Sequence, residues 1–235
     1  MREQLGPFIL GPNSLPVNGI YVGDAEKLGQ EIPNDSVDFI MCDPVYTNYH
    51  QYWWLAMFAS RVLRPGKSVL AQVGSLHRWE AEAQFVSYIQ NGGFLEPRIL
   101  LFERLTGGHT QVWKPRALAC LKTYLWFAKP GPKQKGWIPE LVTGGGRRKR
   151  THVWGDSTQA AETWISRFTE PGEVVVDPFC GSGMVQIACI RTGRRYLGFE
   201  IEPERVESAR IDCARAQAPL IPAGRQLQIA MPIDG

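Results

Sequence analysis

The alternation of strand-like and helix-like segments over the last third of the chain most constrains how it can fold. Residues 173–176 are rich in β-branched side chains, and residues 184–192 follow as a helix that Gly193 ends. Residues 196–199 predict another strand, after which Pro203 opens a helix that continues to about residue 216. Strands that alternate with helices in this way indicate an α/β fold with a doubly wound, mostly parallel sheet.

The preceding residues fit the same architecture and add five strands. A polar loop joins the last two of them, so we expect those two to form an antiparallel hairpin. Residues 129–156 are rich in Pro, Gly and Arg and predict a loop. The predicted strands cover residues 19–23, 37–42, 68–73, 98–105 and 118–128, and the predicted helices cover residues 25–31, 51–63 and 79–90.

The composition indicates a single domain, residues 1–235, with a packed core. Hydrophobic residues make up 44% of the chain and charged residues 21%, which disfavours disorder. No apolar run approaches the length of a membrane span, and the first residues lack the apolar centre of a secretory signal. The five cysteines include no CxxC pair, so we interpret them as reduced core thiols of a cytoplasmic protein rather than as metal ligands.

Residues 177–183, Asp-Pro-Phe-Cys-Gly-Ser-Gly, lead from a predicted strand into a helix. Gly181 and Gly183 carry no side chain, so a ligand can approach the turning backbone closely. Asp177 and Glu200 end neighbouring strands, and an acid at the second position can accept both hydroxyls of a ribose. This pattern suits S-adenosylmethionine, which carries a ribose, an ammonium group and a sulfonium. Two alternatives remain open: an NAD site, whose GxGxxG pattern lacks its third glycine here, and a glycine turn that only packs a helix on a strand.

Residues 43–46, Asp-Pro-Val-Tyr, follow the apolar strand at residues 37–42. The exocyclic amine of a nucleobase is a poor nucleophile because its lone pair is delocalised into the ring. The Asp43 carboxylate and the Pro44 carbonyl could accept both of its N–H bonds and aim the lone pair at a methyl group. Tyr46 could stack on a base that has left the double helix. The alternative is an Asp-Pro turn with a tyrosine that belongs to the core.

The two motifs, in this order, resemble those of the β-class amino-methyltransferases of DNA, which methylate adenine N6 or cytosine N4. In that family an Asp/Ser-Pro-Pro-Tyr/Phe motif precedes the cofactor motif FxGxG, a circularly permuted order, and here residues 43–46 precede Phe179-x-Gly181-x-Gly183. The resemblance covers residues 19–75 and 151–216. It implies a Rossmann-like sheet of seven strands in permuted order, with an antiparallel hairpin strand. It also implies S-adenosylmethionine as the methyl donor and S-adenosylhomocysteine as the product.

The resemblance further assigns roles to single residues. An acid near Asp24 approaches the adenine of the cofactor in the family, and a Pro-Thr-Gln element, here residues 157–159, helps to hold its methionine end. The implied cofactor-binding residues are Asp24, Cys42, Asp43, Ser157, Thr158, Gln159, Asp177, Phe179, Gly181, Ser182, Gly183, Glu200 and Ile201. The sequence departs from the family where Val45 replaces the second proline, and where two alanines at 160–161 replace a Lys-Pro pair. An Asp rather than a Ser at position 43 favours adenine as the target.

An inserted segment at residues 105–152 is the candidate for target recognition. Within it, residues 129–152 hold seven Lys and Arg residues and one Glu, so their net charge is +6 while that of the whole chain is +3. A surplus of this kind is expected where DNA phosphates are contacted, and it also occurs on solvated loops. The candidate DNA-binding residues are His109, Lys114, Arg116, Arg147, Arg148, Lys149 and Arg150. Because the segment is short, we expect a homodimer or larger homo-oligomer to extend the contact.

Together these features predict a cytoplasmic enzyme that transfers a methyl group from S-adenosylmethionine to the N6 amine of an adenine flipped out of double-stranded DNA. Asp43 and Pro44 would hold the amine, and Tyr46 would stack on the base. The alternatives are methylation of cytosine N4, an RNA substrate, and a catalytically weak DNA-binding module with a regulatory role. An NAD oxidoreductase fits the glycine pattern less well. We expect neither a metal ion nor a membrane as a partner.

Overall fold

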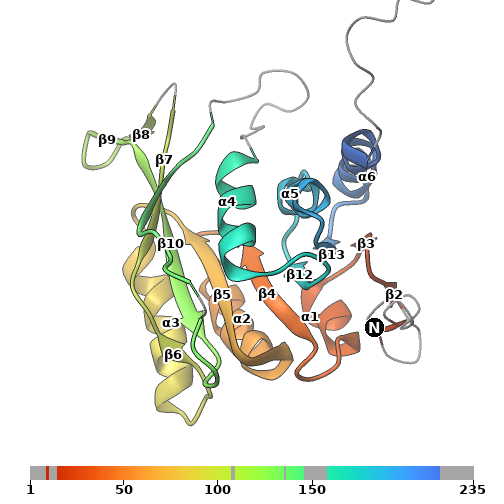
Figure 1. The fold of residues 1–235 in the computed structure, drawn as a ribbon. Helices are drawn as coiled ribbons and strands as arrows, with labels where there is room; N and C mark the ends of the chain where they lie inside the picture. Colours follow the sequence, from red (N-terminus) through yellow and green to blue (C-terminus); the bar gives the residue numbers. More distant parts are fainter. Residues whose placement is uncertain (1–8, 11–14, 107–108, 135, 146–157, 218–235) are drawn as a thin grey trace, which may run out of the picture.

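The computed structural model describes residues 9–10, 15–106, 109–134, 136–145 and 158–217, and its centre is a nine-stranded sheet (Figure 1). The strands of this sheet are β3 (Gly19–Val22), β4 (Val37–Cys42), β5 (Leu63–Val73), β6 (Glu96–Pro97), β7 (Leu101–Arg104), β10 (Leu121–Ala128), β11 (Leu141–Thr143), β12 (Val174–Asp177) and β13 (Arg195–Glu200). Their order is β11-β7-β10-β5-β4-β12-β13-β3, and β6 pairs with the end of β10. Two short pairs lie outside the sheet: β1 (Ile9–Leu10) with β2 (Leu15–Pro16), and β8 (Thr110–Val112) with β9 (Ala117–Ala119).

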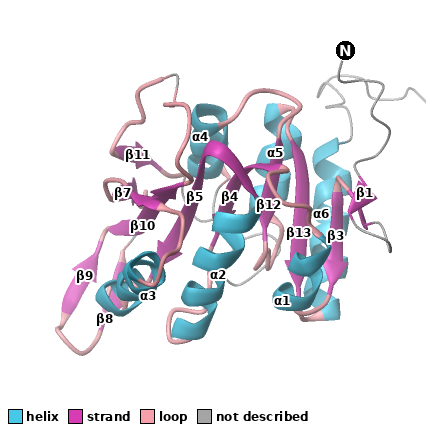
Figure 2. Ribbon diagram, turned by 90° about the horizontal axis from the view of Figure 1, so that it is seen from below, coloured by secondary structure: helices cyan, strands magenta, loops and turns pink. Residues whose placement is uncertain are grey.

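Helices cover both faces of the sheet (Figures 1 and 2). One face carries α1 (Ala25–Leu28), a 3-10 turn at Gly29–Glu31, α2 (Tyr49–Val62) and α3 (Arg78–Gln90), and the other carries α4 (Gln159–Phe168), α5 (Met184–Thr192) and α6 (Pro203–Gln217). The first core is built around Tyr52 and Phe85, and the second around Trp164 and Phe39. Burial of large apolar side chains on both faces stabilises the sheet as the middle layer.

The predicted doubly wound, mostly parallel arrangement is confirmed. The five neighbouring strands β5, β4, β12, β13 and β3 all run parallel. Beyond β5 the direction changes, because β10 pairs antiparallel with both β5 and β7. The predicted number of seven strands is wrong, since β6 and β11 extend the sheet to nine.

Several short elements lie where the sequence predicts loops. Strand β11 falls within residues 129–156; its central residue Val142 is buried, and it pairs parallel with β7. Strand β8 forms within the predicted polar loop, β9 overlaps the start of the strand predicted at residues 118–128, and α4 occupies residues for which the sequence pattern predicts no helix. Each of these strands has only three residues, too few to show an alternating pattern in the sequence. Four of the cysteines are buried, but Cys120 is exposed, so the prediction that all five are core thiols is wrong.

The carboxyl ends of the parallel strands meet at one edge of the sheet, which we call the carboxyl edge. Asp43 follows β4 there, and Asp177 ends the neighbouring strand β12. Open α/β sheets bind ligands at this edge. Among the helices that the structure describes, none combines the length and apolar character needed to cross a bilayer.

Candidate active site

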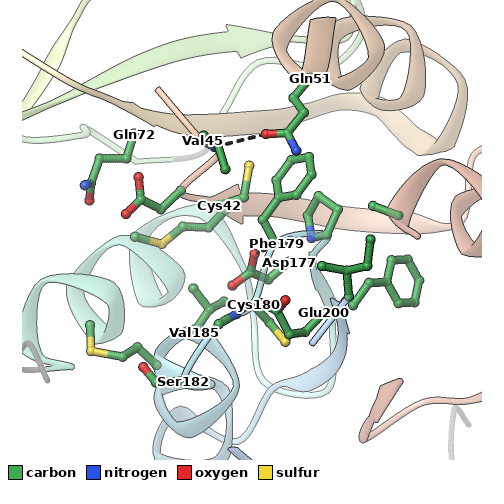
Figure 3. A pocket seen from close by; sticks show the side chains of 18 of the residues that line it. Cys42, Val45, Gln51, Gln72, Asp177, Phe179, Cys180, Ser182, Val185 and Glu200 are labelled. Carbon is green, nitrogen blue, oxygen red and sulfur yellow. Dashed lines mark hydrogen bonds between the residues drawn. The ribbon is translucent and has the colours of Figure 1, made fainter. Parts of the chain in front are cut away.

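A pocket of about 520 Å³ opens at the carboxyl edge (Figure 3). Its walls come from the loops after β3, β4, β12 and β13, from α2 and α4, and from the edge-facing residues of β5, β7 and β10. The parallel and the antiparallel halves of the sheet therefore both contribute to one cavity. A volume of this size accommodates a nucleoside-sized ligand.

Seven polar side chains line the pocket across six neighbouring strands, and we call them the polar row. They are Glu200 on β13, Asp177 on β12, Asp43 after β4, Gln72 on β5, Tyr124 and Lys122 on β10, and Glu103 on β7. Strand register sets their alignment, because Gln72 lies directly opposite Tyr124. Lys122 lies directly opposite Glu103 in the same way. Figure 3 shows Asp177 between Gln72 and Glu200. Three of the four acids in the row, Asp43, Asp177 and Glu200, belong to the neighbouring strands at one end, and Glu103 lies at the other.

Hydrogen bonds and side-chain packing both hold the loop after β12, where the Phe179 ring lies edge-on to Trp54. The Gly181 amide donates to Glu200 Oε2 (3.1 Å), and the Phe179 amide donates to Asp177 Oδ1 (3.1 Å). Gly181 has a φ of +49°, and a Cβ atom placed there would meet no other atom within 4 Å. The residue therefore needs glycine for its backbone conformation and leaves free space towards a ligand.

Burial makes Asp177 an unusual carboxyl group. Its side chain is almost fully enclosed, and this desolvation, together with the nearby charges of Asp43 and Glu200, raises its pKa to about 8. The hydrogen bond from the Phe179 amide offsets part of the shift. An enclosed acid next to two further acids attracts a cation, since a positive ligand would favour its ionised form.

The loop at residues 43–46 is fixed from both sides. The Val45 amide donates to Gln51 Oε1 on α2 (3.0 Å), a bond that a proline at position 45 could not make (Figure 3). Tyr46 accepts a hydrogen bond on its hydroxyl from Gln72 Nε2 (2.5 Å). The Tyr46 ring lies against Gly74, where a Cβ atom would come within 2.7 Å of it. Helix α2 and strand β5 thus each hold this loop through a hydrogen bond.

The other end of the polar row lies on the antiparallel strands. Tyr124 donates its hydroxyl proton to Glu103 Oε2 (2.7 Å), and Lys122 Nζ lies 3.9 Å from the same oxygen. Burial and the adjacent Glu103 carboxylate raise the pKa of Tyr124 well above its ordinary value, so this hydroxyl stays protonated. This end of the pocket therefore presents a neutral phenol and an ammonium group beside one buried carboxylate, that of Glu103, whereas the other end carries the three acids Asp43, Asp177 and Glu200.

The structure brings most of the predicted cofactor-binding residues together. Those that line the pocket are Asp24, Cys42, Asp43, Asp177, Phe179, Gly181, Ser182, Glu200 and Ile201. Gly183 does not line the pocket; it precedes α5 as its N-cap residue and has a φ of +77°. A Cβ atom added to Gly183 would lie 3.0 Å from the Ala209 Cβ atom. Thr158 and Gln159 also lie outside the lining, which includes Ala160 and Ala161 instead. Thr158 bonds with Glu162 and Arg191 at the start of α4.

The predicted catalytic and DNA-contacting residues fall into three groups. Asp43 lines the pocket, whereas Pro44 is buried and Tyr46 lies outside the lining, bonded to the lining residue Gln72. His109, Lys114 and Arg116 are exposed next to or on the β8–β9 hairpin. The residues Ser157, Arg147, Arg148, Lys149 and Arg150 lie outside the described part of the chain.

Sequence reasoning missed Gln51, Gln72, Glu103, Lys122 and Tyr124. One signal was present: Gln72 is the single strongly polar residue near the end of an apolar strand. Glu103 and Lys122 give no such signal, because alternation of polar and apolar residues is ordinary in an antiparallel strand. Only the pairing of β7 with β10 and of β10 with β5 brings them to the pocket.

In comparisons with known proteins, both a family model and a curated relative that match this chain are described as methylases. A family model for N6 and N4 methyltransferases, described as DNA methylase, matches residues 46–210. YubD of Escherichia coli (strain K12), a methylase by name, is 27% identical over 192 residues, which cover 76% of this chain and 82% of that protein.

Two solved structures share the fold. The complex of M1.HpyAVI with SAM superposes with a TM-score of 0.65 at 22% identity, covering 83% of this chain and 98% of that one. The PvuII DNA methyltransferase, described as cytosine-N4-specific, superposes with a TM-score of 0.67 at 17% identity, covering 84% of this chain and 90% of that one.

Proposed function

This chain belongs to the DNA methylase family of N6 and N4 methyltransferases, and we propose that it transfers a methyl group from S-adenosylmethionine to the N6 amine of adenine in DNA. The observation that carries the proposal is the polar row, which runs through one pocket from an acidic end to an end with a lysine. A methyl donor and a nucleobase must lie side by side in such an enzyme, and a pocket that crosses six strands offers two adjoining subsites.

The acidic half of the pocket fits S-adenosylmethionine. The donor carries two positive groups, and the three carboxylates of Asp177, Asp43 and Glu200 line this half. The open space at Gly181 leaves room for the cofactor against the backbone, and the Phe179 ring and Ile201 offer apolar contacts for an adenine. When bound, the cofactor supplies a methyl group that is electrophilic because it is attached to a sulfonium.

The chain's own residues then prepare the amine. We propose that the Asp43 carboxylate accepts one N–H of the base amine and that the Pro44 carbonyl accepts the other, which aims the nitrogen lone pair at the methyl group. The buried position of Pro44 and the Val45–Gln51 hydrogen bond hold both acceptors in place. After methyl transfer the amine loses one proton, which Asp43 or water accepts.

The base itself would occupy the half of the pocket next to β5, β10 and β7. Tyr46, held by Gln72 and supported at Gly74, offers a ring for stacking. Lys122 can donate to a ring nitrogen beside the amine, and Glu103 limits where its ammonium group points. In this scheme the chain acts on double-stranded DNA as a homo-oligomer, with the sheet built in circularly permuted order and residues 105–152 as the recognition segment.

Incubation of DNA with the protein and methyl-labelled cofactor tests the proposal, followed by mass analysis of the nucleosides. We expect N6-methyladenine from the wild type and none from Asp43→Ala, with the affinity for cofactor changed little. Glu170→Ala is a matched control, because this exposed acid precedes β12 at the opposite edge of the sheet. N4-methylcytosine as the product would contradict adenine as the target. If the protein binds DNA but transfers no labelled methyl group to it, the chain is instead a catalytically weak DNA-binding module.

A further inference from the structure

The β8–β9 hairpin presents an exposed tryptophan at its tip. Three antiparallel residue pairs, from Thr110 with Ala119 to Val112 with Ala117, form the stem. The turn closes with a hydrogen bond from the Arg116 amide to the Trp113 carbonyl (3.1 Å), and Arg116 takes a φ of +51°. Trp113 is 81% exposed, although an indole is among the side chains that gain most from leaving water. The tip of the hairpin therefore presents a large aromatic surface to solvent.

The hairpin stands at the same edge of the sheet as the pocket. Because β7 and β5 are both antiparallel to β10, they run in the same direction, and β7 therefore ends at the carboxyl edge. The chain leaves the sheet at Arg104, forms the hairpin and returns at Leu121, the start of β10. Figure 1 shows β8 and β9 beyond the ends of β7 and β10, away from the helices. Two residues of the polar row lie in the sequence on either side of the segment that forms the hairpin: Glu103 before it and Lys122 after it.

The charge and the shape of the hairpin match duplex DNA. Residues 105–121 contain Lys114 and Arg116 and no acidic residue, and both cations are exposed beside Trp113. Cations in this position neutralise phosphates. A two-stranded β-ribbon is narrow enough to enter the major groove, and apolar side chains contact or separate bases where they reach them.

We propose that the β8–β9 hairpin enters the major groove of the DNA beside the target base, with Trp113 in contact with the bases and Lys114 and Arg116 on the flanking phosphates. This inference rests on the proposed function, since it names the element that grips the substrate of the same site. Separation or contact of base pairs by Trp113 lowers the cost of moving the target base out of the helix. The hairpin thereby couples DNA binding to the nearby pocket.

Binding of a fluorescent DNA duplex to the full chain, measured over a series of salt concentrations, tests this inference. We expect Trp113→Ala to weaken binding about tenfold, as is usual when an aromatic contact with a base is lost. The matched control is Phe94→Ala, because Phe94 is 60% exposed but lies between α3 and β6 at the opposite edge. It should bind within twofold of the wild type. In Lys114→Ala/Arg116→Ala the slope of log K against log salt should fall by about 2, close to one unit for each lost phosphate contact.

Equal binding by Trp113→Ala and the wild type, or an unchanged salt slope in the double variant, would overturn the inference. A change in the sedimentation of free Trp113→Ala would also overturn it, because the surface would then belong to a second copy of the chain. Far-UV circular dichroism and cofactor binding check that the variants fold. Methyl transfer by the wild type is measured separately: if the wild type binds DNA through Trp113 but transfers no methyl group, the proposed function fails while the hairpin contact stands.

Discussion

Replacement of Asp177 with asparagine is expected to flatten the pH dependence of the stability of the unliganded protein. The folded chain raises the pKa of this carboxyl from 3.8 to about 8, through burial and the neighbouring acids Asp43 and Glu200. Between these two values the unfolded chain is ionised while the folded chain still holds the proton. The stabilising contribution of this group is therefore complete below pH 3.8 and is lost as the pH rises towards 8.

The size of the effect follows from the linkage relation. One proton bound by the folded chain and not by the unfolded chain lowers the free energy of unfolding by about 1.4 kcal/mol for each pH unit. Between pH 6 and pH 7.5 the wild type should lose about 2 kcal/mol from this group alone. Asparagine keeps the shape of the protonated acid and can still accept the hydrogen bond from the Phe179 amide, but it does not titrate.

Urea unfolding of both proteins at several pH values in this range provides the measurement. The slopes of unfolding free energy against pH should differ by about 1.4 kcal/mol for each pH unit, the effect of one proton, and the asparagine variant should give the flatter line. Parallel lines would refute the reasoning, because Asp177 would then be ionised in the folded chain. The same group should make the affinity for S-adenosylmethionine rise with pH up to about 8, since a cationic ligand favours the ionised carboxyl and releases its proton.

Three further predictions concern the loop, the base end of the pocket and the start of α5. Gln51→Leu should lower methyl transfer about fivefold, because the Val45 amide loses its acceptor at a cost of about 1 kcal/mol, and it should have no further effect in a Val45→Pro background, where that donor is absent. Lys122→Met should raise the KM for DNA while leaving cofactor affinity, measured by calorimetry, unchanged. Gly183→Ala should destabilise the fold by about 2 kcal/mol in urea unfolding, from its positive φ together with the close contact with Ala209. Gly172→Ala is its control, with a similar φ of +81° but no atom within 4 Å, and it should cost only about 1 kcal/mol; equal losses would show that packing at α6 is not involved.

The sequence predicts the parallel half of the molecule well, since local pattern and burial agree there. Strand β4 is buried along its whole length and is apolar apart from Asp38, and α5 is bounded by Gly183 and Gly193, both with positive φ. Asp43, which follows β4, and Asp177, which ends β12, could be placed for the same reason, because each lies at the end of a buried strand. Strand β5 begins earlier than predicted, at Leu63, since the Pro65–Gly66 pair lies inside the strand rather than ending the helix.

The antiparallel half of the sheet could not be predicted in the same detail, because its residues reach the pocket only through pairing between strands that are distant in the sequence. Gln72 is separated from Tyr124 by 52 residues, yet the two lie directly opposite each other in the sheet. Strands β8, β9 and β11 have three residues each and pair with one strand each, so their sequences are too short to show an alternating pattern.

The change of strand direction between β5 and β10 explains how one edge would serve both ligands of the proposed reaction. On the parallel side, every strand reaches the carboxyl edge with its last residue, so the edge collects Asp43, which follows β4, and Asp177 and Glu200, which end β12 and β13. On the antiparallel side, β10 reaches this edge with its first residues, which places Lys122 beside the end of β7. The chain between these two strand ends must also leave and re-enter at this edge, which is where the hairpin stands. A single reversal of direction therefore brings the Lys122–Glu103 pair into the same pocket as the three acids, and it places the β8–β9 hairpin, the proposed DNA contact, next to that pocket.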